Sequence, residues 1–572
     1  MRGVRRSLAA LGLTIAGAPA AALGQIPKRA AGGCDGKIVA SITVTARDPS
    51  LLAAPKRLRP LARWVGLVDV TTTPATITSF LLLAAGQPCT EQQRAESERI
   101  LRLQPFLAAA TVRAVPDDSG RVRIEVETID EIPTVIEMRF QDSRPSEVRL
   151  GNNNIAGQGL YLAASVERGL GYRDGAGVYA VARQIYGKPY MIAIVAKRAP
   201  LGGEFAAALG HAFLTDLQRT AWHVGVSDAN RYESFIVPDG DAPSIDIRRQ
   251  FWDAGGVRRI GVGRHIAFFG VLLTHENVTS SNRLVVISDS GLVPLGRVAF
   301  ADSTVAYRNL RTNAVAGIRA LSFMPVRGFD ALSATQDVAS GVQFGALAGR
   351  TIPYAGSGGG DIFVSTDFYA GVGSVTSFSA VRIESEGRRD LQANDWDSMV
   401  ASGRIAWYLK PATAHVVISS VEFGGGWRDR VPFQLALGDL QGGVRGYGAS
   451  RDAGAVRAVT RLEERWSIGR LTSHDAVGLA SFVDAGRVWA GDAPFGVSSR
   501  TKVGIGASLL AAFPPESQRL WRLDLAIPVS PDAPARWEVR LTGIWTRTFW
   551  REPDDVARGR AGAAPSTIFT WP

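Results

Sequence analysis

The chain has 572 residues, 62 of them glycine, and only 20% of its residues are charged, with a formal net charge of +11. This composition suits short strands joined by turns and argues against a helical bundle. The arginines are spread along the chain without a lysine/arginine block, which argues against a nucleic-acid-binding surface and leaves a basic surplus suited to a lumen or to anionic lipid headgroups.

Residues 1–24 have the pattern of a secretory signal peptide. Basic residues at the start are followed by an apolar run over 8–18 and then by small residues, with cleavage expected after Ala22 or Gly24. We therefore expect an exported protein and leave residues 1–24 out of the fold.

No later stretch offers the roughly 20 continuous apolar residues that a membrane helix needs. Residues 75–86 come nearest, and they predict a buried helix. After export the chain is therefore either soluble or crosses a membrane as a closed β-barrel, the other structure that satisfies its backbone polar groups in lipid.

Residues 35–132 mix helical and strand patterns and predict one small α+β domain. Thr90 is placed to cap a helix that has the acidic Glu91 in its first turn. The expected order is β-α-α-β-β, with strands over 37–46, 107–115 and 121–129 and helices over 75–86 and 90–106.

The two cysteines of the chain, Cys34 and Cys89, both fall in or beside this small domain. Export to an oxidising compartment predicts a disulfide between them, and closing the loop would stabilise the domain by about 4 kcal/mol in the chain-entropy model. A lipid-modified Cys34 is the alternative, against which Lys28 and Arg29 stand where an apolar run would be needed.

Residues 133–552 show a different pattern, in which segments of roughly ten residues alternate apolar with polar or small side chains and are separated by turns. A soluble sandwich alternates in the same way. Export, the long run without helical patterns and aromatic residues at strand ends favour an outer-membrane barrel instead. The predicted fold class is an all-β transmembrane antiparallel β-barrel of about 16 strands, preceded by the one small α+β domain.

The end of the barrel is expected at Trp537–Trp550. This segment alternates over most of its length and ends on aromatic residues, so we predict that it is the closing strand and pairs with a strand within 145–170. Residues 553–572 then form a C-terminal tail.

Three neighbouring segments carry side chains that are unusual for a barrel. A glycine-rich loop reads "GGVRGYG", and the strand after it carries Arg461, Glu463 and Arg465 on one face as candidate lumen ion pairs. If the apolar face of the strand over 477–489 meets lipid, Asp484 points into the lumen, where a carboxylate is costly unless paired. Arg445 is the expected partner. The candidate loop residues are Gly443, Val444, Arg445, Gly446 and Tyr447, and the candidate partner residues are Phe482, Asp484 and Gly486.

These motifs resemble those of the superfamily of outer-membrane insertases and polypeptide translocators that includes BamA, TamA and the two-partner secretion transporters. In that superfamily, POTRA (polypeptide-transport-associated) domains precede the barrel, a VRG[FY] loop folds into the lumen, and the acid of an F-x-D-x-G strand meets its arginine. The resemblance implies an Arg445–Asp484 pair and a single POTRA-like domain at 35–132. BamA and TamA carry several such domains, so this chain departs from them in number.

An enzyme is not expected. Neither G-x-S-x-G nor H-E-x-x-H occurs, the six histidines lack metal-ligand spacing, and residues 356–361 lack the strand-helix context and lysine of a phosphate loop. We therefore predict no catalytic residues, no cofactor and no metal.

The leading functional hypothesis is a monomeric protein of the outer membrane of a Gram-negative-type bacterium, with its POTRA-like domain in the periplasm. Its partners would be outer-membrane lipids and unfolded β-rich client polypeptides, which the domain receives by adding a strand to its sheet edge and which a weak barrel seam accepts next. The alternatives are a dedicated exporter of one partner protein, and a passive pore or surface antigen.

Overall fold

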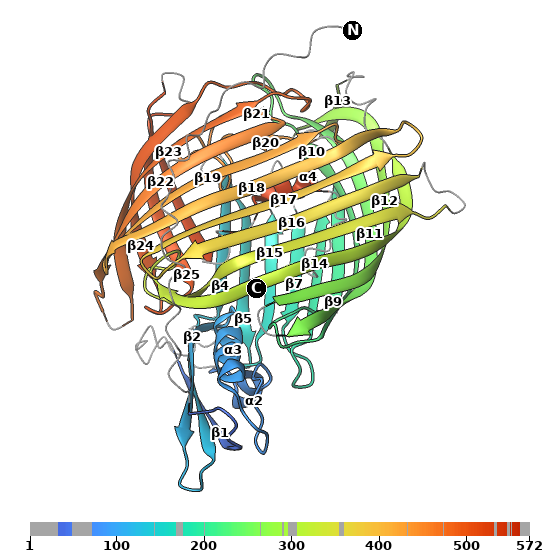
Figure 1. Cartoon of the computed structure of the whole chain (residues 1–572). Coiled ribbons are helices and arrows are strands. Elements are labelled where there is room, and N and C mark those ends of the chain that lie inside the picture. The colour runs from blue at the N-terminus through green and yellow to red at the C-terminus, as the bar shows by residue number, and fades with distance from the viewer. Residues whose placement is uncertain are drawn as a thin grey trace, which may run out of the picture.

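The computed structural model describes residues 33–48, 71–141, 144–167, 175–199, 201–262, 265–288, 291–295, 306–353, 360–431, 433–472, 474–530, 535–545, 550 and 552–560. The predicted signal peptide, residues 1–24, lies outside them. Strands dominate the described chain, and Figure 1 shows a small domain of helices and strands at one end of a single large curved sheet.

The small domain has the element order β-α-α-β-β. Its elements are β1 (Val39–Arg47), α2 (Pro74–Thr78), α3 (Glu91–Arg102), β2 (Leu107–Pro116) and β3 (Val122–Asp130). The sheet order is β1–β3–β2, in which β3 pairs in parallel with β1 and antiparallel with β2. Both β1 and β2 are therefore edge strands.

The two helices of this domain differ in how well the sequence predicts them. Thr90 caps α3 through a capping box, in which its hydroxyl accepts from the Gln93 N–H and the Gln93 side chain accepts from the Thr90 N–H. The predicted helix over 75–86 is wrong in length, because α2 ends at Thr78. Beyond it the Leu82 N–H donates to the Ser97 hydroxyl of α3 (2.9 Å), so a tertiary bond replaces a helical one.

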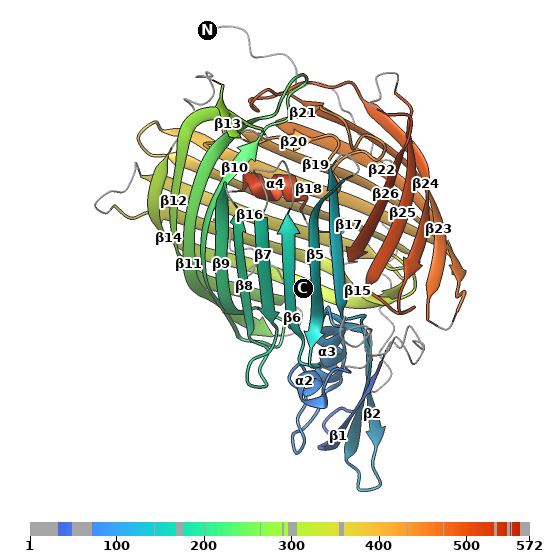
Figure 2. The same ribbon diagram turned by 180° about the vertical axis from the view of Figure 1, so that it is seen from behind.

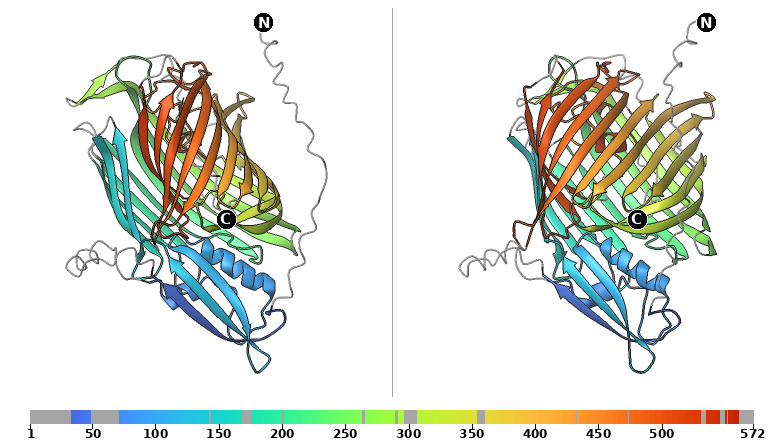
Figure 3. Two further views of the ribbon diagram at one scale, coloured as in Figure 1. Left: turned by 90° about the vertical axis from the view of Figure 1, so that its left-hand side faces the viewer. Right: turned by 60° about the vertical axis from the view of Figure 1, so that its left-hand side comes forward.

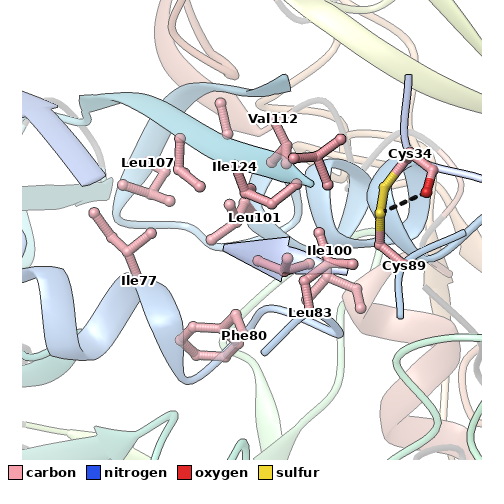
Figure 4. Packing of buried hydrophobic residues seen from close by; sticks show 14 of the residues in the cluster. Cys34, Ile77, Phe80, Leu83, Cys89, Ile100, Leu101, Leu107, Val112 and Ile124 are labelled. Atoms are coloured by element: carbon pink, nitrogen blue, oxygen red, sulfur yellow. Dashed lines mark hydrogen bonds between the residues drawn. A yellow bond between two sulfur atoms is a disulfide. The ribbon is translucent and has the colours of Figure 1, made fainter. Parts of the chain in front are cut away.

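One hydrophobic core holds the small domain together, and it includes the disulfide between Cys34 and Cys89 (Figure 4). Both cysteines are fully buried, and Cys89 lies just before the cap of α3. The disulfide therefore ties the segment before β1 to the start of α3. Figure 4 shows the side chains packed beside it, among them Leu83, Ile100, Leu101 and Val112.

We expect the Cys34→Ser/Cys89→Ser variant to lose local stability in this domain by about 4 kcal/mol, because the open loop gains chain entropy in the unfolded state. Hydrogen exchange of the β2 and β3 amides in the full-length protein measures the loss. Either single variant should behave like the double variant, and unchanged exchange in all three would contradict the prediction.

The large sheet is antiparallel and forms one ring. Its strands are β4 (Thr134–Gln141), β5 (Arg144–Ile155), β6 (Leu160–Glu167), β7 (Gly175–Ala182), β8 (Met191–Ala199), β9 (Gly202–His211), β10 (Thr220–Ser234), β11 (Pro243–Val262), β12 (His265–Ser288), β13 (Gly291–Pro294), β14 (Tyr307–Arg327), β15 (Thr335–Thr351), β16 (Asp361–Gly373), β17 (Ser377–Asp390), β18 (Asp395–Ala412), β19 (His415–Trp427), β22 (Val456–Gly469), β23 (Ala476–Trp489), β24 (Lys502–Ala512), β25 (Arg519–Pro528) and β26 (Glu538–Trp545).

The predicted number of about 16 strands is too low, since the described residues of the ring contain 21 strands, including the four-residue β13. The prediction allowed for long connections between strands. The structure instead has several tight ones, such as the two residues 413–414 between β18 and β19. Less chain per connection leaves room for more strands.

The last strand of the large sheet in chain order is β26, which lies within the predicted closing segment Trp537–Trp550. In the ring order its second neighbour is β4, so the predicted partner strand within 145–170 is wrong. The sheet begins directly after the small domain, one strand earlier than the alternation suggested. Neighbouring strands of the ring pair in register from β4 to β12 and from β14 to β26, and β12 pairs directly with β14. Between β26 and β4 none of the described residues gives a register pair.

The two faces of the ring differ sharply in chemistry. On β23, Leu479 and Val483 are 46% and 44% exposed on the outer face, whereas Phe482 and Asp484 are buried on the inner face. The same alternation places Leu541 outside and Arg540 inside on β26. Among the described residues, no helix has the length and apolarity to cross a membrane.

The small domain rests against the end of the ring through α3 (Figures 1 and 3). Arg102 of α3 makes two bonds to the Asp337 carboxylate of β15, at 2.8 and 2.7 Å. The Thr215 hydroxyl, between β9 and β10, donates to Glu96 of α3 (2.7 Å). Bonds to two separate parts of the ring fix the orientation of the domain.

Glu131, between β3 and β4, is buried at this junction and is 3% exposed. The Ser517 hydroxyl bonds to its carboxyl oxygens at 2.9 and 2.8 Å, and the cation of Arg519 lies nearby. Burial raises the pKa of the Glu131 carboxyl to about 8, against the bonds from Ser517 and the charge of Arg519. The folded protein therefore keeps Glu131 protonated at neutral pH.

A raised pKa lowers stability as the pH rises, because the unfolded state ionises Glu131 from about pH 4.5 while the folded state does so near pH 8. We expect the free energy of unfolding of Glu131→Gln, which cannot ionise, to rise relative to that of the wild type by roughly 3 kcal/mol between pH 5 and pH 7.5. Guanidinium unfolding in detergent micelles at both pH values measures this gain. A difference in the free energy of unfolding between wild type and variant that does not change with pH would contradict the prediction.

Candidate functional site

The glycine-rich loop lies between β19 and β22 and enters the interior of the ring. A two-stranded sheet of β20 (Leu435–Ala436) and β21 (Ala453–Gly454) joins its two ends. Gly446 has a φ of +94°, a backbone conformation that glycine adopts without steric cost. Gly504 of β24 lies so close to the Arg445 carbonyl oxygen that a Cβ there would clash. The loop can therefore fold back and lie directly on the wall.

Arg445 at the tip of this loop meets Asp484 of β23. The Arg445 Nε donates to Asp484 Oδ2 (2.7 Å) and its Nη2 donates to Oδ1 (2.8 Å), so the guanidinium binds the carboxylate in a bidentate fashion. Its Nη1 donates to Glu463 Oε2 (2.8 Å), and its Cζ lies 3.5 Å from the centre of the Phe482 ring. The structure thus brings together the two motifs that the sequence singles out.

Glu463 extends this pair into a network of charges in the interior. Its carboxylate accepts from Arg465 (2.5 Å) and from both terminal nitrogens of Arg522 on β25 (2.9 and 2.8 Å). Arg522 also bonds to Asp524 (3.1 Å). Three arginines and three carboxylates meet with no net charge, as buried ions require.

Arg461 has a different role from its neighbours on the same strand face. Its Nη2 donates to the backbone carbonyls of Gly443 (2.8 Å) and Gln441 (3.2 Å), and its Nη1 lies 3.4 Å from Glu422. It therefore holds the backbone of the loop and does not join the cluster around Glu463.

The rest of the motif fastens the loop to the last strands of the ring. Tyr447 is fully buried; its hydroxyl donates to the Val503 carbonyl (3.1 Å) and accepts from the Ser530 N–H (3.2 Å). The amides of Gly446 and Gly448 both donate to Glu538 Oε2 on β26, at 2.9 and 3.0 Å. Val444 packs against Gly486, whose missing side chain leaves room for it. The loop is therefore bonded to β26 beside the β26–β4 seam.

Sequence reasoning missed Arg522, Asp524 and Glu538 as site residues. Arg522 and Asp524 are buried and Glu538 is half-buried, all three on strands whose alternation is visible, so their inward direction was predictable. The partners of Arg522 and Glu538 in the site, Glu463 and Gly446, lie 59 and 92 residues away along the chain, which no local pattern shows.

Comparisons with known proteins give a structural likeness without a sequence match. No protein-family model matches the chain, and no curated protein matches it either. The chain is similar to solved structures of BamA and CdiB.

These likenesses extend over most of the chain at low identity. BamA from Haemophilus ducreyi lacking POTRA domains 1–3 is 13% identical, with 89% of this chain and 84% of that chain covered and a TM-score of 0.33. CdiB from Escherichia coli is 12% identical, with 92% and 93% covered and a TM-score of 0.35. CdiB from Acinetobacter baumannii is 8% identical, with 83% and 74% covered and a TM-score of 0.37.

The Arg445–Asp484 pair gives a direct test of the site. We expect Arg445→Ala and Asp484→Ala each to lower stability by roughly 3 to 5 kcal/mol, because each leaves the other buried charge without its partner. The double variant should cost less than the sum. Arg445→Lys should restore only part of the loss, since an ammonium cannot hold the carboxylate with two arms.

Guanidinium unfolding in detergent micelles measures these costs. The exposed Arg428–Asp395 pair (2.5 Å) is the matched control, and Arg428→Ala should cost less than about 1 kcal/mol. Equal, small costs at both pairs would refute a structural role for the interior pair.

Proposed function

We propose that this chain is a non-enzymatic outer-membrane protein that assists the insertion, assembly or translocation of other polypeptides. In this proposal the ring is a transmembrane barrel of a Gram-negative-type bacterium, and the small domain is a periplasmic POTRA-like domain. The observation that carries the proposal is the interior loop, which is locked by Arg445 and bonded through its glycine amides to β26 at the seam.

The outer face of the ring supports a membrane location. Large apolar side chains stand exposed on successive strands, among them Leu479, Ile505, Leu525 and Leu541. Several charged side chains of the same strands are buried inside, among them Asp484, Lys502, Arg522 and Arg540. Apolar-out and polar-in alternation is what a lipid-facing barrel wall requires. In water the same face would be a large exposed apolar patch.

Two strand edges support a polypeptide client. In the small domain, β2 pairs only with β3 among the described strands. At its other edge the Val112 N–H donates to Glu98 (3.1 Å) and the Val112 carbonyl accepts from Arg94, both of α3, so an extended segment added there takes the place of these two side chains. In the ring, β26 and β4 are neighbours, and the seam between them is where the last and first strands of the sheet meet. In this proposal the seam opens, because the backbone groups of an open strand edge are templates for another strand.

The placement of the small domain connects these two edges. Its α3 is held on the ring by the Arg102–Asp337 pair, and β3 leads into β4 through the buried Glu131. A client received on β2 is therefore presented at the end of the ring at which β4, one side of the seam, begins.

Export of one partner protein through the interior is the second candidate. The polar and charged inner wall favours it, because a translocated segment would pass buried charged residues such as Arg311, Glu422 and Arg522. Insertion at the seam and export through the interior predict different contact sites for the client.

Site-specific photo-crosslinking in cells separates them. A photoreactive residue at Leu541 on β26 or at Arg113 on β2 should capture newly exported β-rich polypeptides. Val483, equally on the outer face but on β23, is the control and should capture lipid-facing background only. Crosslinks from the interior position Ser508 alone would favour the exporter, and no client at any position would contradict both.

A further inference from the structure

The chain does not end at the ring wall, since residues 552–560, here called the C-terminal segment, lie inside it. They include α4 (Asp554–Gly559), which Figures 1 and 2 show enclosed by the strands of the ring. Before it, Trp550 packs edge-on against Tyr369 of β16, with ring centres 6.1 Å apart. The described part of the predicted C-terminal tail is thus an interior element.

One anchor of the C-terminal segment is Asp555. Arg457 of β22 holds its carboxylate, with Nη2 3.0 Å from Oδ1, and both side chains are 2% exposed. The neighbouring Val556 is buried against Val400 and Leu435. A buried charge and a buried apolar side chain therefore fix the middle of the segment.

A second anchor lies at Arg560. Its Nε donates to Glu552 of the same segment (2.7 Å), its Nη2 donates to Ser402 of β18 (3.2 Å), and its Nη1 lies 3.4 Å from Glu386 of β17. Ser402 also donates to Glu552. On another part of the wall, Arg249 of β11 reaches the Arg558 carbonyl (3.4 Å). The contacts run from β22 across to β11.

Residues 552–560 contain no cysteine, so no disulfide ties the segment to the wall. A helix of six residues is not stable by itself, so the anchors decide where it lies. Without it, Arg457 would lose its carboxylate partner from this segment, and Glu386 its contact with Arg560. The wall thus fits a short peptide that carries a carboxylate and, five residues later, an arginine.

We propose that the wall around Arg457, Ser402 and Glu386 is a polypeptide-docking surface, and that the C-terminal segment occupies it as a plug that closes the interior. Passage through the interior then requires the segment to leave, and a client segment with the same order of charges can take its place. The plug acts on the interior alone, so it holds whether clients are inserted at the seam or exported.

Ion conductance in planar lipid bilayers tests the plug. The chain ended after Trp550 keeps all of β26 and should conduct several-fold more than the full-length protein. A peptide of residues 552–560 added to the shortened protein should lower its conductance again. The same peptide with Asp555→Arg and Arg560→Glu should have no effect. Equal conductance of the shortened and full-length proteins, or equal effects of the two peptides, would overturn the proposal.

Point variants of the full-length chain provide a second test that does not depend on the truncation. Arg457→Asp should raise the conductance, and adding Asp555→Arg should lower it again, because the swapped pair restores the anchor. Arg558→Ala is the control in the same segment, since its side chain is exposed and its bond to Arg249 is made by the backbone carbonyl, which the variant keeps. Each variant is first shown to be folded by its heat-dependent shift on gels. No rescue by the swapped pair would also overturn the proposal.

Discussion

Charges enclosed by a β-sheet ring must be paired, and the Arg445–Asp484 pair is where this constraint shapes the molecule most. Asp484 is fully buried on the inner face of β23, and its carboxylate is bonded by both arms of a guanidinium that arrives on a loop. Leaving either ion alone costs more than the pair contributes to stability. The loop is therefore held inside by the cost of separating these ions, together with the burial of its Leu437, Val444 and Tyr447 against the wall.

The Arg445–Asp484 pair also affects the seam between β26 and β4, because the loop that carries Arg445 bonds to β26. Its tip is fixed at Asp484, and the two glycine amides beyond it are bonded to Glu538. Arg540 of β26 reaches back to the Leu440 carbonyl at the start of the loop (3.1 Å). The pair and β26 are thus linked through one loop, and in the proposed function β26 is the strand at which a client is added.

The sequence predicts local features of this structure well and distant ones poorly. The residue types of Thr90 and Gln93 indicate the capping box of α3, and the alternation of apolar and polar side chains on β23 predicts its inner and outer faces. The short α2 was not predictable, because a bond from Leu82 to Ser97 ends its helical pattern. The pairing of Arg445 with Asp484 came from a family resemblance and from charge arguments, whereas the position of the C-terminal segment depends on β17, β18 and β22, far away in the chain.

Hydrogen exchange of the loop amides tests the central claim most directly. The amides of Gly446 and Gly448 should exchange slowly in the protein in lipid bilayers, because Glu538 accepts from both. In Asp484→Asn, which keeps the shape but removes the charge that holds Arg445, their exchange should become fast while the β23 amides stay protected. Fast exchange of the loop in the unchanged protein would contradict the account.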